Sequence, residues 1–409
     1  MSTDLRRGTI ILSLFMVAVL TNGASFSEGL FYGPITQEFG FSRTQGATLA
    51  STTHLTSGIM LFFAGILLRK IPAQIMQSAG FLILASGYLV TSTAQSYASL
   101  LTGYFLIGLG LGTVALLVTS PVVVNNWFDK RKNLALATIY IGTSAGGAVI
   151  TATLGRVLET EGWRAGYTLM ALPMFAMPLL LLLFVRTAPP TESNRAVDAP
   201  VKQAEDGLTL RQGLARSAFW QLIFAFTLYM AVSAAVFLHF VPSLLDSGMS
   251  QSGAAARMSL LLLAAVPGKL LFGWLGDRIG TRLSLIGVLL SAAVALTYYA
   301  SGLTALSLGI FLICFGLAYS APLVLIPMAL AKLVGRRNLS VFTGVAMVVS
   351  TIGWSAGPLL GGWLRDSLGS YSLVFTILAG GLVAAAILIH FALKDDGVPA
   401  RQPGLNHAT

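Results

Sequence analysis

Long apolar stretches follow one another along almost the whole chain, separated by short polar segments that carry most of the charged residues. About twenty apolar residues in an α-helix cross the roughly 30 Å hydrocarbon core of a bilayer. The stretches are rich in Gly, Ala and Leu and lack the dyad alternation of a membrane β-barrel. The pattern predicts twelve transmembrane helices, at 9–33, 44–68, 73–95, 98–125, 133–157, 164–186, 216–243, 254–276, 282–301, 304–331, 340–364 and 371–393.

The composition indicates the same class of protein. Of the 409 residues, 55% are hydrophobic and 10% are charged, whereas about a quarter of the residues in soluble domains carry charge. We therefore predict an all-α membrane protein. The formal net charge of +10 does not indicate nucleic-acid binding, because the basic residues are spread over many helix ends rather than gathered on one face.

Basic residues are divided unevenly between the two sides of the predicted helices. If the N-terminus is inside, most of the 25 Lys and Arg residues fall on the inner side, including Arg69, Lys70, Lys130, Arg131 and Lys132. Cytoplasmic segments retain an excess of basic residues. We therefore expect a multi-pass protein of the cell membrane, a bacterial inner membrane, with both termini in the cytoplasm.

One long polar segment interrupts the apolar pattern between the sixth and seventh predicted helices. Residues 187–213 are rich in Pro, Ser, Asp and Glu, a composition that cannot bury a core. This segment is expected to be a cytoplasmic linker between a six-helix bundle at 1–186 and a second six-helix bundle at 214–409. Weak internal symmetry supports the division, because residues 65–72 and 273–282 follow the second helix of their respective halves.

The segment after the eighth predicted helix carries a specific motif. Its sequence, GWLGDRIGTR, resembles the loop signature Gly-x-Leu-x-Asp-Arg-x-Gly-x-Arg of the major facilitator superfamily. Transporters with two parallel six-helix halves hold their solute between the halves, near mid-membrane. We expect the motif to act as a conformational latch, because its glycines permit a tight turn and its Asp can cap or pair with helix ends. The expected latch residues are Gly273, Asp277, Arg278, Gly280 and Arg282.

Other segments resemble the monocarboxylate transporter family and its bacterial relatives, which include the oxalate–formate antiporters. These segments are 31–34, 38–43, 127–135, 142–147 and 162–164. The resemblance implies transport of small organic anions by alternating access. It also implies a functional role for Lys269, which stands where relatives carry a basic residue, normally Arg, and for His239 and Tyr319.

Lys269 is the ionisable residue with the clearest functional signal. It lies deep in the apolar eighth helix, where a charged side chain costs roughly 2.5–3.5 kcal/mol on insertion scales and so persists facing protein or water. A buried ammonium favours an anionic partner. We expect Lys269 to bind the substrate and to take part in proton coupling. The alternative is a lysine that extends to the membrane surface or pairs with a backbone carbonyl.

Further polar side chains could complete the site. Glu28, toward the outer end of the first helix, is a candidate proton carrier or a partner of Lys269, although a carboxylate there can simply be solvated. His239 could handle substrate or protons, or make a packing hydrogen bond between helices, and His54 gives a weaker signal. Hydroxyl side chains could bind substrate or link helices. The candidates are Thr119, Tyr140, Thr143, Tyr319, Ser320 and Thr351.

The predicted function is proton-coupled symport of small monocarboxylates. Exchange of dicarboxylates such as oxalate, and proton-driven efflux of small drug-like molecules, are the alternatives. The expected partners are a small organic anion, the proton and the lipid bilayer, with no nucleic acid and a monomeric chain. No cofactor or metal is expected, since Cys314 is the single cysteine and no metal-ligand cluster occurs in the sequence.

An enzyme is not expected. Residues 142–146 fit the Gly-x-Ser-x-Gly motif of hydrolases, but that motif needs a strand-to-helix turn and here it falls inside a predicted membrane helix.

Overall fold

The computed structural model describes residues 3–128, 131–185, 207–335 and 337–394. Within these ranges the regular structure is helical, apart from a single bridge between Gly207 and Gly335. Twelve spans of the described chain are long and apolar enough to cross a membrane. The predicted all-α class and the predicted number of transmembrane helices are therefore confirmed. The predicted linker at 187–213 lies outside the described residues up to position 206.

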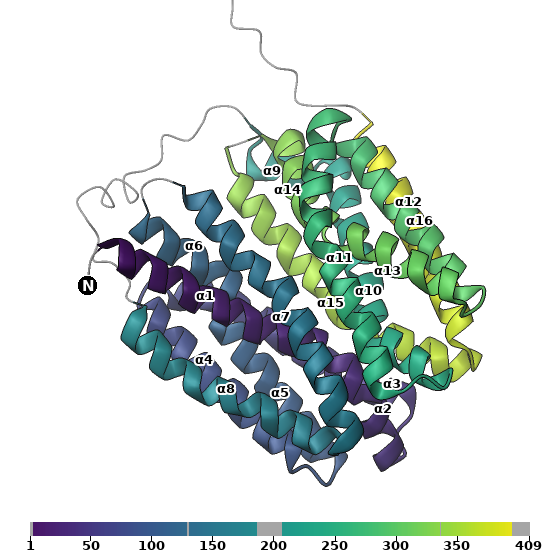
Figure 1. Cartoon of the computed structure of the whole chain (residues 1–409). Helices are drawn as coiled ribbons and strands as arrows, with labels where there is room; N and C mark the ends of the chain where they lie inside the picture. Colours follow the sequence, from purple (N-terminus) through teal and green to yellow (C-terminus); the bar gives the residue numbers. More distant parts are fainter. Residues whose placement is uncertain (1–2, 129–130, 186–206, 336, 395–409) are drawn as a thin grey trace, which may run out of the picture.

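The chain forms two helical bundles that lie side by side in Figure 1. The first contains α1 (Thr3–Phe26), α2 (Glu28–Phe39), α3 (Arg43–Leu67), α4 (Ala73–Ser92), α5 (Tyr97–Val114), α6 (Leu116–Trp127), α7 (Lys132–Thr160) and α8 (Gly162–Phe184). The second contains α9 (Leu210–Leu214), α10 (Ser217–Asp246), α11 (Gln251–Arg278), α12 (Thr281–Ala300), α13 (Ala305–Tyr319), α14 (Ala321–Val334), α15 (Leu339–Leu368) and α16 (Tyr371–Ala392).

Three spans are built from two helices each, which the apolar pattern did not predict. The breaks lie at Ser27, Ala115 and Ser320. Ala115 adopts a positive φ of 46°, and the Ser27 hydroxyl donates to the Gly23 carbonyl at 2.6 Å. Pro322, in the first turn of α14, has no N–H to continue the preceding helix. Side chains that bond the freed backbone groups make such breaks tolerable within a membrane.

Hydrogen bonds join the two bundles at the end of the molecule where α3 begins, which we call the far side; the end where α1 begins is the N-side. The carboxylate of Asp366, in α15, accepts from the backbone N–H groups of Arg43 at 2.9 Å and of Thr44 at 2.7 Å. The Arg43 guanidinium lies 2.8 Å from Asp246 of α10. Acceptors at a helix N-terminus satisfy its free N–H groups. The second bundle therefore caps α3 of the first.

Closer to mid-membrane the bundles pack through small residues. The Ser259 hydroxyl of α11 donates to the Ala148 carbonyl of α7 at 2.8 Å. A methyl group at Gly155 of α7 would lie 2.2 Å from the β-carbon of Ala255 in α11. Such positions let helices from opposite halves approach closely. Figure 1 accordingly shows α7 and α11 adjacent at the boundary between the bundles.

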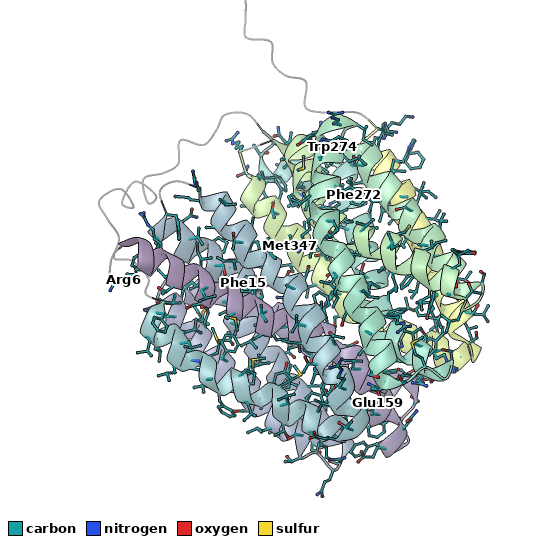
Figure 2. All side chains as sticks on the ribbon, in the orientation of Figure 1. Arg6, Phe15, Glu159, Phe272, Trp274 and Met347 are labelled. Carbon is teal, nitrogen blue, oxygen red and sulfur yellow. The ribbon has the colours of Figure 1, made fainter. Side chains whose placement is uncertain are left out.

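The predicted latch residues lie on the N-side, at the end of α11 and the start of α12. Gly280, between the two helices, has a φ of 88°, a conformation that favours glycine, whereas Gly273 lies inside α11 and not in a turn. The Arg278 guanidinium lies 4.7 Å from the ring centre of Trp274, and Arg282 Nη2 lies 3.1 Å from His390 Nδ1. Both contacts stay within the second bundle, so they do not fasten it to the first. Figure 2 shows Trp274 at this end of the molecule, opposite Glu159 on the far side.

Contacts of the second bundle begin inside the predicted linker. The Leu208 N–H donates to the Val334 carbonyl at 2.8 Å, and the Asn338 side chain donates to the Leu208 carbonyl at 2.9 Å. Thr209 and Gln212 then form a reciprocal capping box that starts α9. The second bundle therefore starts before the predicted boundary at 214, because local capping holds a short helix that hydrophobicity does not reveal.

Candidate functional site

Lys269 reaches from the second bundle to the first. Its half-buried ammonium donates to Ser144 Oγ at 3.2 Å and to Thr143 Oγ1 at 3.4 Å, both in α7. The Thr143 hydroxyl itself donates to the Tyr140 carbonyl at 2.8 Å. These partners are neutral, and among the described residues no carboxylate lies within ion-pair distance of Lys269. The ammonium therefore faces protein between the bundles rather than lipid.

The rotation of α11 places Lys269 on this face. Ala255, Ser259 and Leu262 of α11 contact α7, and Lys269 lies seven residues, about two helical turns, beyond Leu262. Gly268 fixes the adjacent face, since a methyl group there would lie 2.2 Å from the Leu317 carbonyl oxygen of α13. Lys269 is therefore on the same face of α11 as Ala255, Ser259 and Leu262, the face that packs on α7.

Ser144 is the nearest partner of Lys269, and the sequence analysis missed it. It belongs to the segment that fits a hydrolase motif, and α7 is indeed a helix at that point, with no strand-to-helix turn. Ser144 is buried. Its adjacency to Thr143 was a signal for a polar face, but a hydroxyl among small residues of a membrane helix is usually a packing contact.

Aromatic rings gather where two of the broken spans meet. Phe26 ends α1 and Tyr319 ends α13, and their ring centres lie 6.1 Å apart with perpendicular planes. Phe237 of α10 lies 4.5 Å from Tyr319 and 5.0 Å from Phe26. The Tyr229 hydroxyl donates to the Tyr319 carbonyl. Tyr319 is therefore at the boundary between the bundles, as a substrate contact requires.

His239 makes its hydrogen bonds within the second bundle, and its ring also contacts Tyr32 of α2 in the first bundle, with ring centres 5.2 Å apart. It is fully buried, with Nε2 2.9 Å from the Pro358 carbonyl and Nδ1 3.4 Å from the Tyr371 hydroxyl. Both ring nitrogens thus have partners from neighbouring helices. The arrangement corresponds to the packing alternative, because an imidazole buried with both nitrogens bonded has none left for a solute in this conformation.

Three further predicted hydroxyls also bond elsewhere. Ser320 donates to the Ala265 carbonyl at 2.9 Å, inside the second bundle. Thr119 accepts from Gln77 at 2.7 Å and donates to the Ala115 carbonyl at 3.0 Å, inside the first. These bonds satisfy groups at or near the breaks in their spans. Thr351 donates to the carbonyl one turn earlier in α15, and its methyl group packs on Gly58 of α3.

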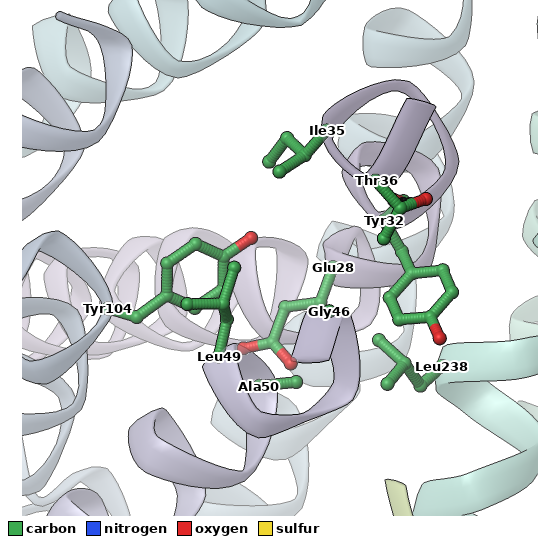
Figure 3. A pocket seen from close by; sticks show the side chains of 9 residues that line it. All are labelled: Glu28, Tyr32, Ile35, Thr36, Gly46, Leu49, Ala50, Tyr104 and Leu238. Carbon is green, nitrogen blue, oxygen red and sulfur yellow. Dashed lines mark hydrogen bonds between the residues drawn. The ribbon is translucent and has the colours of Figure 1, made fainter. Parts of the chain in front are cut away.

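Glu28 is paired with a residue other than Lys269. Its Oε2 lies 3.3 Å from Nε2 of His54 in α3, and the two side chains are 13% and 11% exposed. Lys269 is not its ion-pair partner in this structure, and the Glu28 side chain is largely enclosed by protein. The His54 ring centre lies 5.6 Å from that of Trp354, in α15 of the second bundle. Figure 3 shows the Glu28 carboxylate beside Leu49 and Ala50, with Tyr104 close by.

Comparison with known proteins agrees with this architecture. The family model of the Major Facilitator Superfamily matches residues 11–356, with a further match at 241–408. An uncharacterized MFS-type transporter of Bacillus subtilis, YcxA, is 25% identical and the match covers 94% of this chain and 95% of that protein. Mouse monocarboxylate transporter 12 is also 25% identical, with 93% of this chain and 84% of that protein covered.

Solved structures share the fold. A bacterial homologue of the human lysosomal transporter Spinster, in an inward-facing and occupied conformation, superimposes with a TM-score of 0.77 at 20% identity, covering 96% of this chain and 99% of that one. These similar proteins are transporters rather than enzymes. On the match of the family model, the twelve spans and their two-bundle arrangement, the chain belongs to the Major Facilitator Superfamily of membrane transporters.

Proposed function

We propose that this protein is a secondary active transporter that moves a small organic anion, a monocarboxylate, together with a proton by alternating access. The observation that carries the proposal is Lys269, a cation between the two bundles whose partners are the neutral hydroxyls of Thr143 and Ser144. Relatives that carry the name monocarboxylate transporter support the substrate class.

The ammonium of Lys269 has capacity for an anion. It offers three donors and a full charge, and the Thr143 and Ser144 hydroxyls balance none of that charge. In a medium of lower dielectric constant than water, a carboxylate beside an ammonium gains more Coulomb energy than it would in solution. Tyr140 and Tyr319 are proposed to complete the binding site, because they lie on helices that border the boundary between the bundles.

Coupling to a proton follows from the cost of charge in the membrane. An anion that crosses with one proton adds no net charge to the moving protein, so the transport step avoids the cost of carrying charge through the bilayer. Lys269 and Glu28 are the candidate proton carriers. Anion exchange needs no proton and remains the rival mechanism, which transport assays can separate.

The contacts between the bundles suggest which state the structure represents. The hydrogen bonds from Asp366 to α3 and from Arg43 to Asp246 join the bundles on the far side. We propose that this end is closed here and opens in the other state, with the N-side facing the cytoplasm of a bacterial cell. The segment from Gly273 to Arg282 would then fasten the N-side when the far side opens.

Transport in proteoliposomes tests the proposal. Wild-type protein is expected to accumulate at least one labelled monocarboxylate from a small panel when an inward proton gradient is imposed. Lys269→Ala should lose at least about a hundredfold in uptake, in line with the cost of an unbalanced anion in the membrane, and Lys269→Arg should retain part of it. Arg257→Ala, a cation on the same helix that bonds the Gly253 carbonyl, is the matched control.

Two results would overturn the proposal. One is full uptake by Lys269→Ala. The other is wild-type protein that moves no monocarboxylate under any gradient. Uptake that requires oxalate or another dicarboxylate inside the vesicle, and ignores the proton gradient, would establish exchange instead.

A further inference from the structure

We infer that Glu28 and His54 together form the proton-binding site of the transport cycle, a carboxylate–imidazole pair that takes up a proton on the far side and releases it on the N-side. The inference rests on the proposed symport and deepens it, because it assigns the coupled proton to a pair in the first bundle rather than to Lys269. His54, for which the sequence gave only a weak signal, thereby acquires a role in proton binding.

The pair has the geometry of a shared proton. Glu28 is the first residue of α2, directly after the break at Ser27, and His54 lies in the middle of α3. The 3.3 Å between Glu28 Oε2 and His54 Nε2 is within ion-pair distance. An imidazole and a carboxylate that share one proton are jointly neutral, whether the proton sits on nitrogen or oxygen.

Because the pair is buried, its free energy depends strongly on its net charge and hence on the number of protons it holds. With side chains 13% and 11% exposed, Glu28 and His54 have little water to stabilise an unbalanced charge. Loss of the shared proton leaves the pair at −1, and gain of a second proton leaves it at +1; both states are costly in an apolar environment. The pair therefore keeps one proton during the crossing with the anion and releases it where water reaches the pair. In the return crossing without anion, the pair at −1 offsets the +1 of Lys269, so the empty protein carries no net charge from these groups and no proton returns.

The surroundings contain hydroxyls and a small cavity. The cavity, about 10 Å³, is large enough for about one water molecule. It is lined by Glu28, Tyr32, Thr36 and Tyr104 together with apolar side chains such as Leu238 of α10. A water molecule there could pass a proton to or from the carboxylate. Besides His54, the titratable groups among the described residues of other helices that interact electrostatically with Glu28 include the phenols of Tyr88 in α4, Tyr104 in α5 and Tyr167 in α8.

The second bundle forms one wall of the site. Trp354 of α15 packs edge-on against the His54 ring, with ring centres 5.6 Å apart. Next to Glu28, a methyl group at Gly29 would lie 2.8 Å from the Phe237 carbonyl oxygen of α10, so α2 and α10 are in direct backbone contact. Separation of the bundles on the far side would remove Trp354 and α10 from the pair and admit water. The exchange of the proton is thereby linked to the same movement that exposes the substrate site.

Two transport modes separate this role from substrate binding. Glu28→Gln and His54→Gln are expected to reduce uptake driven by the proton gradient by at least about tenfold, while exchange of labelled for unlabelled substrate at equal pH stays within about threefold of wild type. Exchange continues because it needs no net proton release. Glu161→Gln is the matched control, since Glu161 is an exposed carboxylate that directly follows α7.

Tryptophan fluorescence tests the inference in variants whose transport is too weak to measure. Protonated imidazole quenches a neighbouring indole, so the difference in fluorescence between wild type and Trp354→Phe should change with pH, and His54→Gln should abolish that change. Variants that retain proton-driven uptake, or a pH response that survives His54→Gln, would overturn the inference. Wild-type protein that shows uptake without any dependence on the proton gradient would instead contradict the proposed symport, whatever the variants do.

Discussion

The two ionisable centres of the protein, Lys269 and the Glu28–His54 pair, differ in how their charge is balanced. Glu28 and His54 lie in one bundle, 3.3 Å apart, so one proton shared between them leaves the pair neutral. Lys269 belongs to one bundle, reaches the other and finds neutral Thr143 and Ser144 there. A compensated pair changes its charge when a proton binds or leaves, whereas an uncompensated cation gains most from an anion. The comparison suggests that the first bundle handles the proton and the second bundle supplies the charge that binds the anion.

The largest effect is expected from a variant that gives Lys269 a permanent counter-ion. Ser144→Asp places a carboxylate where the nearest hydroxyl lies, at 3.2 Å from the ammonium in wild type. The resulting ion pair should exclude the substrate anion, and we expect a loss of at least about a hundredfold in kcat/KM, comparable to the truncation of a buried charge partner. Substrate uptake at saturating proton gradient measures the loss. Ser144→Asn, similar in shape but neutral, is the control, and equal activity of the two variants would contradict the anion site.

A smaller effect is expected from a variant that weakens the contacts between the bundles on the far side. Opening at this end is proposed to expose both ionisable centres. Asp366→Asn removes the charge that caps α3 through Arg43 and Thr44. Loss of a helix cap costs about 0.5–2 kcal/mol, enough to shift the balance between open and closed states several-fold. A cysteine at Ser51, whose carbonyl accepts from Ser355 across the boundary, should then react faster with a membrane-impermeant thiol reagent.

This labelling experiment needs a background without Cys314. Asp277→Asn is the contrasting variant, because Asp277 lies on the N-side, where it should favour the opposite shift if the proposed latch is real. Labelling at Ser51→Cys that is insensitive to Asp366→Asn would show that the far-side bonds do not hold this state.

The smallest effect is expected from Ser144→Ala, which tests how much one neutral hydrogen bond to Lys269 contributes to binding. Ser144→Ala removes a neutral acceptor of the ammonium while leaving Thr143 in place. A single hydrogen bond contributes about 0.5–1.5 kcal/mol, so KM should change by about twofold to tenfold with little change in kcat. Initial rates over a range of substrate concentrations give both constants. A loss as large as that of Lys269→Ala would mean that Ser144, not the cation, dominates binding.

The sequence was informative where an ionisable residue lies within an otherwise apolar helix. Lys269 could be singled out because a cation deep in a membrane helix is costly, and the structure places it against Thr143 of the other bundle. Glu28 could be singled out for the same reason. His239 could not be assigned, because a buried imidazole that packs and one that binds solute look alike in a sequence.

The number of spans, the all-α class and the two-bundle plan were determined by the sequence alone, because hydrophobicity and length decide which segments cross a bilayer. The partners were decided by tertiary structure. His54 lies 26 positions after Glu28 and Ser144 lies 125 positions before Lys269, and no local pattern specifies such pairs. The rotation of each helix and the close approach allowed by glycines such as Gly155 set which side chains meet.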